Sequence, residues 1–500
     1  MKFSARIITV SVIIAFLLIS CTQPTPAPYH PPTPIISHEP TVFDIDIESP
    51  ASNQRLSDPR PNIIFILTDD QPYHTVDYMP AVKGELMKNG VVFVNAFATT
   101  PLCCPSRVSI LTGQYVHNHQ VYTNRPPLGG AQKFDDLASF SIWLQEAGYQ
   151  AAYFGKYLNE YEGLTPRGYV PPGWDVWNAF LGRNLTQVED TGNAQYYFDY
   201  SMSENGLEVE YPKNSDNFSA DVITNRALAF IRDARESAFF MMVAYYNPHS
   251  PYLPAPRHRD SFRASTGWDW VQYRPPSFNE TDIRDKPDYI ADLSPLSETE
   301  VDTAHKQILR SILSVDDGVA SILAALNKAG LSQNTIIIYM SDNGLTLGDH
   351  RFGATKNCPY EACIKVPFIV YAPGNYAPRT DTHLVANIDL APTIAQWAGI
   401  SPPNSVDGVS LVPILQDPSA SWRDAILLEH WPTEEGVGSM IPEFYSVRTV
   451  EWKYTEYTTG EVELYDLVND PFELKNVAGK RDYADIQAKL AIRLKELMKE

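Results

Sequence analysis

The sequence has little of several features that define common protein classes. Only five cysteines occur in 500 residues, so disulfides do not frame the fold as they do in small secreted domains. Beyond the N-terminal segment, no apolar stretch is long enough to span a membrane. Lys and Arg number 39 against 60 Asp and Glu, and the net charge of −21 argues against a nucleic-acid partner. The sequence contains no internal repeat, which argues against a solenoid or propeller.

The chain begins with a targeting segment, residues 1–21. Lys2 and Arg6 precede an apolar stretch at residues 7–19, and the segment ends in Leu-Ile-Ser-Cys at Cys21, which resembles a bacterial lipoprotein cleavage box. The resemblance implies cleavage before Cys21 and a lipid anchor on its thiol; a plain secretory signal is the alternative. Residues 22–60 are rich in Pro, Ser and Thr and are predicted to be an extended tether. A lipoprotein signal and a plain secretory signal both place the protein outside the cytoplasm. The lipoprotein signal also makes a membrane its partner.

Continuous apolar runs that end in polar residues dominate the central region. Such runs are typical of strands buried on both faces of a parallel sheet. The predicted strands are residues 62–67, 151–154, 239–244, 335–340 and 366–371. Helical patterns separate them, at residues 139–148, 220–235, 300–329 (one helix or a broken pair) and 389–398. This alternation predicts an α/β fold, in which ligands bind beyond the carboxyl ends of the strands.

The pattern changes after about residue 420. Short alternating segments predict antiparallel strands at residues 444–449, 452–457 and 463–467, followed by an amphipathic helix at 482–499. We therefore expect a main catalytic domain at residues 61–418. Residues 419–500 are expected to form a smaller C-terminal α+β subdomain with an antiparallel sheet.

Two of the central strands are followed by clustered oxygen ligands. Asp69 and Asp70 follow the first strand, and Asp342 and Asn343 follow residues 335–340. Three carboxylates and an amide suit a hard cation; Ca²⁺ accepts an irregular shell, whereas Mg²⁺ demands an octahedron. The sequence shows no His and Cys cluster typical of zinc sites. One Asp-Asp pair at a strand end would be read as a helix cap or turn, but the two clusters together predict a metal site.

Residues 103–113 read Cys-Cys-Pro-Ser-Arg-Val-Ser-Ile-Leu-Thr-Gly. Pro105 suits the first position of a helix, and Gly113 suits a left-handed C-cap. Cys103 would then lie just before a helix N-terminus, where free amides and the helix dipole favour an anion. The alternative is a buried Cys pair before an ordinary short helix. However, Cys-x-Pro-Ser-Arg followed by Leu-Thr-Gly resembles the signature of the type I sulfatases.

This resemblance implies an alkaline-phosphatase-like fold, with a large mixed, mostly parallel sheet between helices. It also implies that a maturation enzyme oxidises Cys103 to formylglycine, whose hydrate attacks sulfur, while Cys104 stays a packed thiol. Residue 103 would complete a Ca²⁺ shell made by Asp69, Asp70, Asp342 and Asn343; Mg²⁺ is the less suitable ion.

The same resemblance assigns roles to four further side chains. Arg107 would hold the aldehyde hydrate and the metal-bound carboxylates in place. Lys156, His249 and Lys356 would grip the sulfate and protonate the leaving oxygen. Taken singly, such Lys and His residues are ordinary surface or structural groups, and only their positions after the strands and in the family pattern favour catalysis.

Longer stretches of sequence indicate which group of sulfatases the chain resembles. Residues 155–161, Gly-Lys-Tyr-Leu-Asn-Glu-Tyr, are similar to the N-acetylglucosamine-6-sulfatases and the extracellular heparan endosulfatases, as are residues 112–119, 313–317 and 385–393. The similarity runs from about Pro61 to the C-terminus. Many other sulfatases have a catalytic His where this chain has Leu158. His117 or His119 is a candidate to hold the second hydroxyl of the formylglycine hydrate in the place of that His. The alternative is a structural role for either histidine.

These observations predict an extracytoplasmic hydrolase of sulfate monoesters, with the 6-O-sulfate of N-acetylglucosamine or a related sulfated glycan as substrate. The net charge of −21 is unfavourable for an anionic substrate, so either local cations at the site overcome the overall field or the substrate carries few charges. One alternative is a phosphate or phosphonate monoester hydrolase of the same superfamily. Another is a non-catalytic lipoprotein that binds sulfated glycan. Whether Cys358 and Cys363 form a disulfide or a free buried pair stays open.

Overall fold

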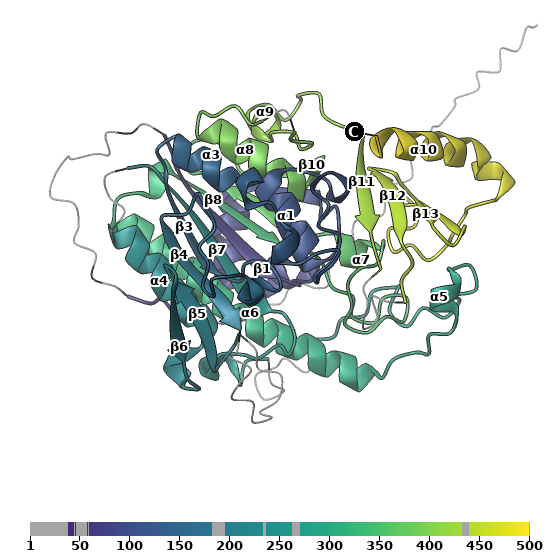
Figure 1. Cartoon of the computed structure of the whole chain (residues 1–500). Helices are drawn as coiled ribbons and strands as arrows, with labels where there is room; N and C mark the ends of the chain where they lie inside the picture. Colours follow the sequence, from purple (N-terminus) through teal and green to yellow (C-terminus); the bar gives the residue numbers. More distant parts are fainter. Residues whose placement is uncertain are drawn as a thin grey trace, which may run out of the picture.

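A ten-stranded sheet forms the centre of the protein in this computed structural model (Figure 1). The structure describes residues 39–44, 46, 58, 60–182, 196–233, 237–262, 271–403, 405–432 and 440–499. The strand order is β10-β2-β9-β8-β1-β7-β3-β4-β5-β6. Their bounds are β1 Asn62–Asp69, β2 Val91–Phe97, β3 Gln150–Gly155, β4 Val176–Gly182, β5 Tyr200–Glu204, β6 Leu207–Tyr211, β7 Phe239–Pro248, β8 Thr335–Ser341, β9 Phe368–Tyr371 and β10 Arg379–Ala386.

The middle of the sheet is parallel, and antiparallel strands lie to either side. β8, β1, β7, β3 and β4 run parallel to one another, whereas β9 is antiparallel to β8 and β2, and β5 is antiparallel to β4 and β6. All eight residues of β1 are buried. The prediction of a large mixed, mostly parallel sheet is confirmed, and the carboxyl ends of β1, β3, β7 and β8 share one edge.

Helices cover both faces of the sheet (Figure 1). Ile63 and Phe65 of β1 pack in one core with α1, α3 and α8, whereas Ile64 and Ile66 pack in a second core with α4 and α6. α6 is a single unbroken helix of 31 residues. The longer helices are α1 Cys103–Thr112, α3 Phe140–Glu146, α4 Ser219–Asp233, α6 Glu298–Lys328, α8 Leu390–Trp397 and α10 Ala484–Leu497, and the shorter ones are α2 Val116–His119, α5 Asp288–Ala291, α7 Glu361–Ile364 and α9 Val412–Gln416.

A four-stranded antiparallel sheet forms the C-terminal part, in the order β11-β12-β13-β14. Its strands are β11 Ala425–His430, β12 Phe444–Thr449, β13 Trp452–Tyr457 and β14 Val462–Asp466. The sequence predicted the last three strands and the helix α10, but it missed β11. Leu490 and Leu494 of α10 share a core with Leu427 of β11 and Phe97 of the large sheet, so the small sheet is packed onto the main body.

Part of the segment predicted as a tether lies against α6. The Thr41 amide donates to Asp317 Oδ1 at 2.7 Å, and the Phe43 amide donates to Ser321 Oγ at 2.9 Å. The predicted signal segment, Cys21 and most of residues 22–60 lie outside the described residues. In the part of the chain that the structure describes, no helix has the length and apolarity needed to cross a membrane.

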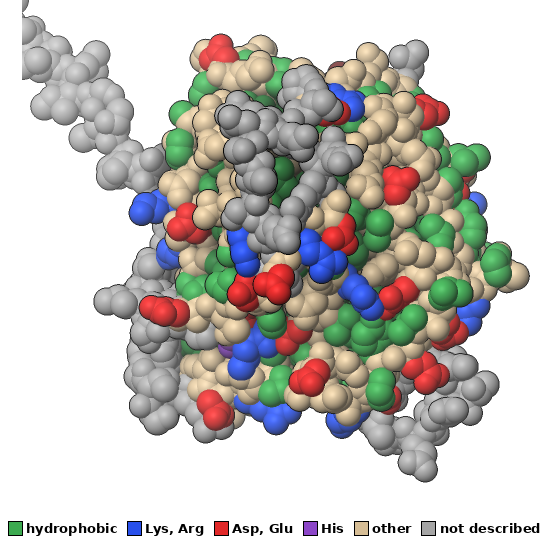
Figure 2. Space-filling model, turned by 90° about the vertical axis from the view of Figure 1, so that its left-hand side faces the viewer, with side chains coloured by type: hydrophobic (Ala, Val, Ile, Leu, Met, Phe, Trp, Pro, Cys, Tyr) green, Lys and Arg blue, Asp and Glu red, His purple; other side chains and the backbone are tan. Residues whose placement is uncertain are grey.

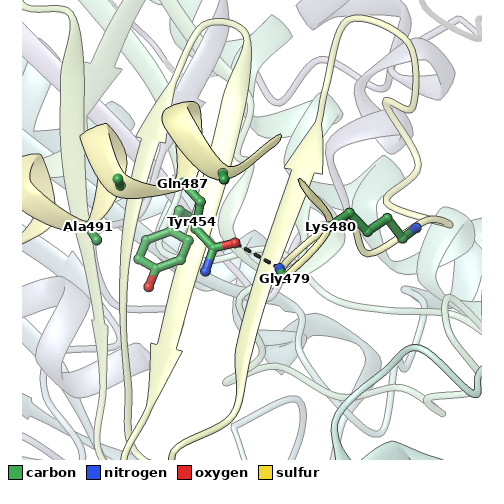
Figure 3. Close-up of a pocket in the computed structure, with 7 residues that line it drawn as sticks. Tyr454, Gly479, Lys480, Gln487 and Ala491 are labelled. Atoms are coloured by element: carbon green, nitrogen blue, oxygen red, sulfur yellow. Dashed lines mark hydrogen bonds between the residues drawn. The ribbon is translucent and has the colours of Figure 1, made fainter. Parts of the chain in front are cut away.

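One face of the surface and one pocket are drawn in the figures. On the face drawn in Figure 2, Lys and Arg side chains are interspersed with Asp and Glu. A shallow pocket lies between α10 and the small sheet, where the Gly479 amide donates to Gln487 Oε1 at 2.8 Å (Figure 3). It is lined by Tyr454, Gly479, Lys480, Ala484, Gln487, Ala488 and Ala491. None of the predicted site residues lies in it.

Candidate active site

The two oxygen clusters meet because β1 and β8 are parallel neighbours in register. Thr68 pairs with Ser341, and the Asp342 amide donates to the Thr68 carbonyl at 3.0 Å. Asp70 has a φ of 60°, a left-handed conformation that Asp tolerates, and it ends the strand sharply. Its amide donates to Asp342 Oδ1 at 3.1 Å. The three carboxylates predicted from separate stretches of sequence therefore lie together.

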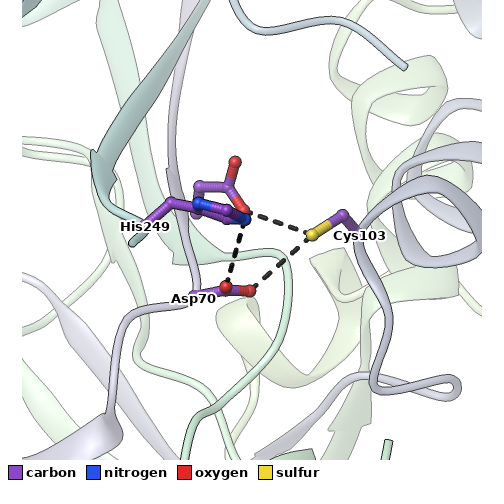
Figure 4. Close-up of side chains that lie close together, drawn as sticks. Asp70, Cys103 and His249 are labelled. Atoms are coloured by element: carbon purple, nitrogen blue, oxygen red, sulfur yellow. Dashed lines mark hydrogen bonds and ion pairs between the residues drawn. The ribbon is translucent and has the colours of Figure 1, made fainter. Parts of the chain in front are cut away.

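The signature segment supplies the helix that points at this cluster. α1 begins at Cys103, two residues earlier than the sequence predicted, so Pro105 is the third helical residue. Its missing N–H costs nothing there, because the first four amides of a helix have no partner within it. Gly113 closes α1 with a φ of 71°, as predicted. Cys103 Sγ lies 3.3 Å from Asp69 Oδ1 and 3.7 Å from Asp70 Oδ1 (Figure 4).

Arg107, one turn further along α1, ties the helix to the strand ends. Its side chain is 1% exposed, and its Nε donates to Asp342 Oδ2 at 2.8 Å. One Nη lies 3.6 Å from Asp69 Oδ2, and the other donates to the carbonyl of Lys156 at 2.6 Å. Arg107 therefore balances two buried carboxylates and fixes the end of β3, as expected for a positioning group.

The three remaining predicted residues surround Cys103. Lys156 follows β3 and forms an ion pair with Asp69. Lys356 Nζ donates to Asp70 Oδ1 at 2.6 Å and to Cys103 Sγ at 2.7 Å. His249 Nε2, just past β7, lies 3.6 Å from Asp70 Oδ2 (Figure 4). All five residues predicted for catalysis are thus in one cluster.

A glycine at the end of β3 makes the position of Lys156 attainable. Gly155 has a φ of 110°, and a Cβ there would lie 2.0 Å from the Ala244 carbonyl oxygen. Only glycine allows this approach of β3 to β7. The Lys156 amide then donates to the same carbonyl at 2.8 Å.

Burial and mutual charge shift the pKa values of the cluster in opposite directions. Burial raises the pKa of Asp69, but the nearby charges of Lys156, His249, Arg107 and Lys356 outweigh it and lower the pKa below its ordinary value. Burial, together with the charge of Asp69, raises the pKa of Asp342 to about 6. Burial also raises the pKa of the Cys103 thiol well above its ordinary value. An unmodified thiol at this position is therefore a poor nucleophile, because the thiolate is disfavoured.

The donor set fits a hard cation. Asn343 Nδ2 donates to Asp70 Oδ1 and to the Gly344 carbonyl, both at 2.8 Å, which leaves its Oδ1 buried without a hydrogen-bond partner among the described residues. Asp69 Oδ2 makes ion pairs but no hydrogen bond there. Asp69, Asp70, Cys103 and His249 each offer a ligand atom within 4.8 Å of the others. Buried carboxylate and amide oxygens are the ligands that hard cations such as Ca²⁺ and Mg²⁺ take.

His117 and His119, the two candidates to hold the second hydroxyl of a formylglycine hydrate, do not lie in the cluster around Cys103. His119 Nε2 is 3.0 Å from Ser109 Oγ, and its Nδ1 accepts the Val121 amide at 3.1 Å. Burial lowers the pKa of His119 to about 3, so it is a neutral structural group. His117 pairs with Glu429 of β11. Neither histidine contacts Cys103 among the described residues, and Leu158 is buried.

Several residues that support the cluster had no predicted role. The ring of Tyr246 packs 4.6 Å from that of His249 and 5.5 Å from Lys156 Nζ. Asn387 Nδ2 donates to Ser106 Oγ at 3.0 Å, and Ser106 donates to the Asp342 carbonyl. Ser106 belongs to the signature and Asn387 to residues 385–393, but the sequence indicated no role for either, and the only signal for Tyr246 was its proximity to His249. Cys358 and Cys363, left open by the sequence, form a disulfide.

Comparisons with known proteins identify the family. The family model described as Sulfatase matches residues 61–400, and the model described as N-sulphoglucosamine sulphohydrolase, C-terminal, matches residues 348–500. The N-acetylglucosamine-6-sulfatase of Homo sapiens is 34% identical over 465 residues, which are 84% of this chain and 81% of that protein. The extracellular sulfatase SULF-1 homolog of Drosophila melanogaster is 32% identical over 386 residues, or 74% of this chain.

The chain spans 53% and 33% of the length of the extracellular sulfatase relatives from Caenorhabditis elegans and Drosophila melanogaster. A solved structure of BT4656 in complex with its substrate D-glucosamine-2-N,6-O-disulfate has a TM-score of 0.69 and 26% identity, and the match covers 88% of this chain and 98% of that one. The residues matched by the Sulfatase model include every side chain of the cluster around Cys103. The chain therefore belongs to the sulfatase family.

Proposed function

We propose that the protein hydrolyses sulfate monoesters, with formylglycine at position 103 and Ca²⁺ as cofactors, and with the 6-O-sulfate of N-acetylglucosamine or a related glycan as substrate. The observation that carries this proposal is a single cluster: Cys103 Sγ contacts Asp69 and Asp70, Asp70 contacts Asp342 and Asn343, and three cationic or basic side chains lie around it. A binding protein without catalysis has no need for this combination.

The proposed cofactors fit the groups described above. Residue 103 with the side-chain oxygens of Asp69, Asp70, Asp342 and Asn343 would hold the cation. Bound there, Ca²⁺ would stabilise negative charge on sulfate oxygens and favour ionisation of a hydroxyl. Formylglycine in its hydrated form would supply that hydroxyl as the nucleophile, in place of a thiol whose pKa burial raises.

The chain's own side chains then bind the sulfate and manage the protons. Lys156 and Lys356 place two ammonium groups beside the reacting position, where they offset the charge that builds on the equatorial oxygens. His249 Nδ1 lies 2.8 Å from the Ser250 carbonyl, to which it donates, so Nε2 faces the cluster. Lys356 Nζ, and His249 Nε2 when the ring carries both protons, are the two groups placed to protonate the leaving alcohol oxygen. Arg107 keeps Asp69 and Asp342 in position.

The rest of the proposal concerns where the enzyme works and how it is organised. The signal segment and Cys21 support an extracytoplasmic enzyme anchored to a membrane by lipid, and Cys103 requires a formylglycine-generating maturation enzyme. We place the catalytic domain at residues 61–418 and the C-terminal subdomain at residues 419–500. The start of β11 at Ala425 supports this boundary.

The test compares paired aryl sulfate and aryl phosphate esters, followed by N-acetylglucosamine 6-sulfate, using protein exported by a host that makes formylglycine. The proposal predicts release of sulfate well above release of phosphate, and loss of both in Cys103→Ala. A higher rate on the phosphate ester would favour a phosphomonoester hydrolase. Absence of turnover of every ester by the matured protein would contradict the proposal.

A further inference from the structure

The disulfide between Cys358 and Cys363 closes a short loop next to Lys356. Both cysteines are fully buried, and the bond joins positions five residues apart in the chain. We call residues 358–363 the disulfide loop. It begins two residues after Lys356, whose ammonium donates to Cys103 Sγ at 2.7 Å. A movement of the disulfide loop would therefore move the backbone that carries this lysine.

The disulfide loop contacts the segment that supplies a proposed metal ligand. The amide of Gly344, the residue after Asn343, donates to the Cys363 carbonyl at 2.8 Å. A Cβ on Gly344 would lie 2.2 Å from the carbonyl oxygen of Ala362, so the two segments meet backbone to backbone with no room for a side chain between them. The disulfide loop and the proposed metal ligand are thus fixed relative to each other.

The residues on either side of the disulfide loop contact the segment that leads into α1. The Asn357 amide donates to the Pro101 carbonyl at 3.0 Å, two residues before the nucleophile position. The Ala98 amide, just past β2, donates to the Ile364 carbonyl at 2.8 Å. These hydrogen bonds connect the backbone next to Lys356 with the backbone that places residue 103.

Other residues of the disulfide loop contact the C-terminal sheet. Lys453 of β13 donates through Nζ to the Pro359 carbonyl at 2.5 Å. The Tyr360 hydroxyl donates to Oε1 of Glu463 in β14 at 2.7 Å. Both contacts are buried, and a buried polar group that loses its partner pays its full desolvation cost. The C-terminal sheet therefore restrains the disulfide loop, and through it the backbone near the active site.

The disulfide supplies rigidity that the secondary structure of this segment lacks. α7 has only four residues, and helices shorter than about 12 residues are marginal on their own. The bond links Cys363 of α7 to Cys358, which lies close to Lys356 in the chain. A cross-link of this kind removes alternative conformations of the chain that it closes. Without it, we expect the backbone around Lys356 to sample more positions.

We propose that the disulfide loop is a positioning element for Lys356, restrained by the C-terminal sheet, and that it keeps Nζ within reach of the leaving alcohol oxygen. This inference rests on the proposed function, in which Lys356 protonates that oxygen. A lysine side chain is a flexible four-carbon stem, so the place of its ammonium depends on a fixed backbone at its base. Proton transfer requires hydrogen-bond distance, and a displacement of about 1 Å can cost about 100-fold in rate.

The first experiment compares wild type with the double variant Cys358→Ser and Cys363→Ser on aryl sulfates whose phenols differ in pKa. A general acid matters most for a basic leaving group, because a weakly basic phenolate departs without a proton. We expect kcat/KM of the double variant to fall about 30-fold or more for the most basic phenol and less than about threefold for 4-nitrophenyl sulfate. An equal loss across the series, or no loss, would overturn the inference.

Tyr360→Phe tests the same element with the disulfide intact. It removes one hydroxyl from Glu463, which still accepts hydrogen bonds from Tyr457 and Tyr465, so the variant should fold. We expect a smaller loss of kcat/KM that again grows with the basicity of the phenol. A loss that is the same for every phenol would count against restraint by the C-terminal sheet.

Leu326→Ala is the matched control for lost stability. Leu326 is 1% exposed near the end of α6, shortly before β8 begins, whereas Lys356 follows the end of β8. The substitution should lower the free energy of unfolding by about 2–5 kcal/mol. It should change kcat/KM by the same factor for every phenol. If its dependence on the phenol changed as much as that of the double variant, lost stability alone would explain the effect and the inference would fail.

Hydrogen exchange separates this inference from the proposed function, because it needs no turnover. The Asn357 amide reports directly on the backbone beside Lys356. We expect the peptide that contains it to exchange about tenfold faster or more in the double variant, with no change in Leu326→Ala. Unchanged exchange in the double variant would contradict the inference even if the enzyme hydrolyses sulfate esters. Faster exchange, with no turnover of any ester by wild type, would support the restraint of residue 356 and refute the proposed function alone.

Discussion

Replacing Arg107 with Gln removes the positive charge on which the buried carboxylates depend. The guanidinium is 1% exposed, contacts Asp342 at 2.8 Å and Asp69 at 3.6 Å, and donates to the Lys156 carbonyl. Removing one partner of a buried pair typically costs roughly 3–5 kcal/mol, because the other charge stays buried without compensation. We therefore expect Arg107→Gln to lower the free energy of unfolding by about 3–5 kcal/mol when a chelator is present.

The assay is urea unfolding followed by tryptophan fluorescence, with and without Ca²⁺. Arg226→Gln is the matched control: Arg226 pairs with Glu204 at 2.7 Å, but its side chain is 43% exposed, so the loss should stay below about 1 kcal/mol. The loss of unfolding free energy in Arg107→Lys should lie between those of Arg107→Gln and Arg226→Gln. Lys keeps the positive charge but lacks the planar guanidinium that donates several hydrogen bonds at once. A loss below about 1 kcal/mol for Arg107→Gln would refute the charge balance described here.

Three further predictions concern pH, metal and the disulfide. Both ring nitrogens of His430 lack partners among the described residues, and burial lowers its pKa to about 3. In the unfolded state His430 takes up a proton below about pH 6.5, whereas in the folded state it stays neutral. The free energy of unfolding therefore falls as the pH drops below about 6.5. His430→Leu should therefore gain about 2 kcal/mol relative to wild type on going from pH 7 to pH 5, measured by thermal unfolding; an unchanged difference would contradict this. Ca²⁺ at about 100 times its Kd should stabilise the protein by about 2.7 kcal/mol, with a smaller effect of Mg²⁺; equal or absent shifts in melting temperature would argue against a Ca²⁺ site. Replacing Cys358 and Cys363 together with Ser should cost about 2 kcal/mol because the closed loop is short, and a loss above about 5 kcal/mol would show that the bond does more than close that loop.

The sequence predicted which residues would lie together, because their position depends on strand ends. Asp69 and Asp342 follow continuous apolar runs, and parallel strands bring their carboxyl ends to one edge wherever they lie in the chain. The signature then identified Cys103 and Arg107, and the resemblance identified Lys156, His249 and Lys356.

Other parts of the fold carried no readable signal. β6, with Glu208 and Glu210, is mostly exposed, so it lacks the apolar run that marked the central strands. β11 was missed, and with it the pairing of Glu429 with His117 across 312 positions of sequence. Such a contact depends on how the small sheet packs against α2, which local periodicity does not encode. The start of α1 shifted by two residues because the free amides of its first turn tolerate Pro105 at a later position.

The measurement that tests the central claim most directly is peptide mass spectrometry of residues 98–115, from protein exported by its native host. The account predicts the mass loss of thiol-to-aldehyde conversion at Cys103, with Cys104 unchanged. Cys103 and Cys104 are both buried in the folded protein, so oxidation confined to one of them would reflect a specific maturation step and not general exposure. An unmodified Cys103 in native protein would contradict the formylglycine mechanism and favour a protein that binds sulfated sugars without hydrolysing them.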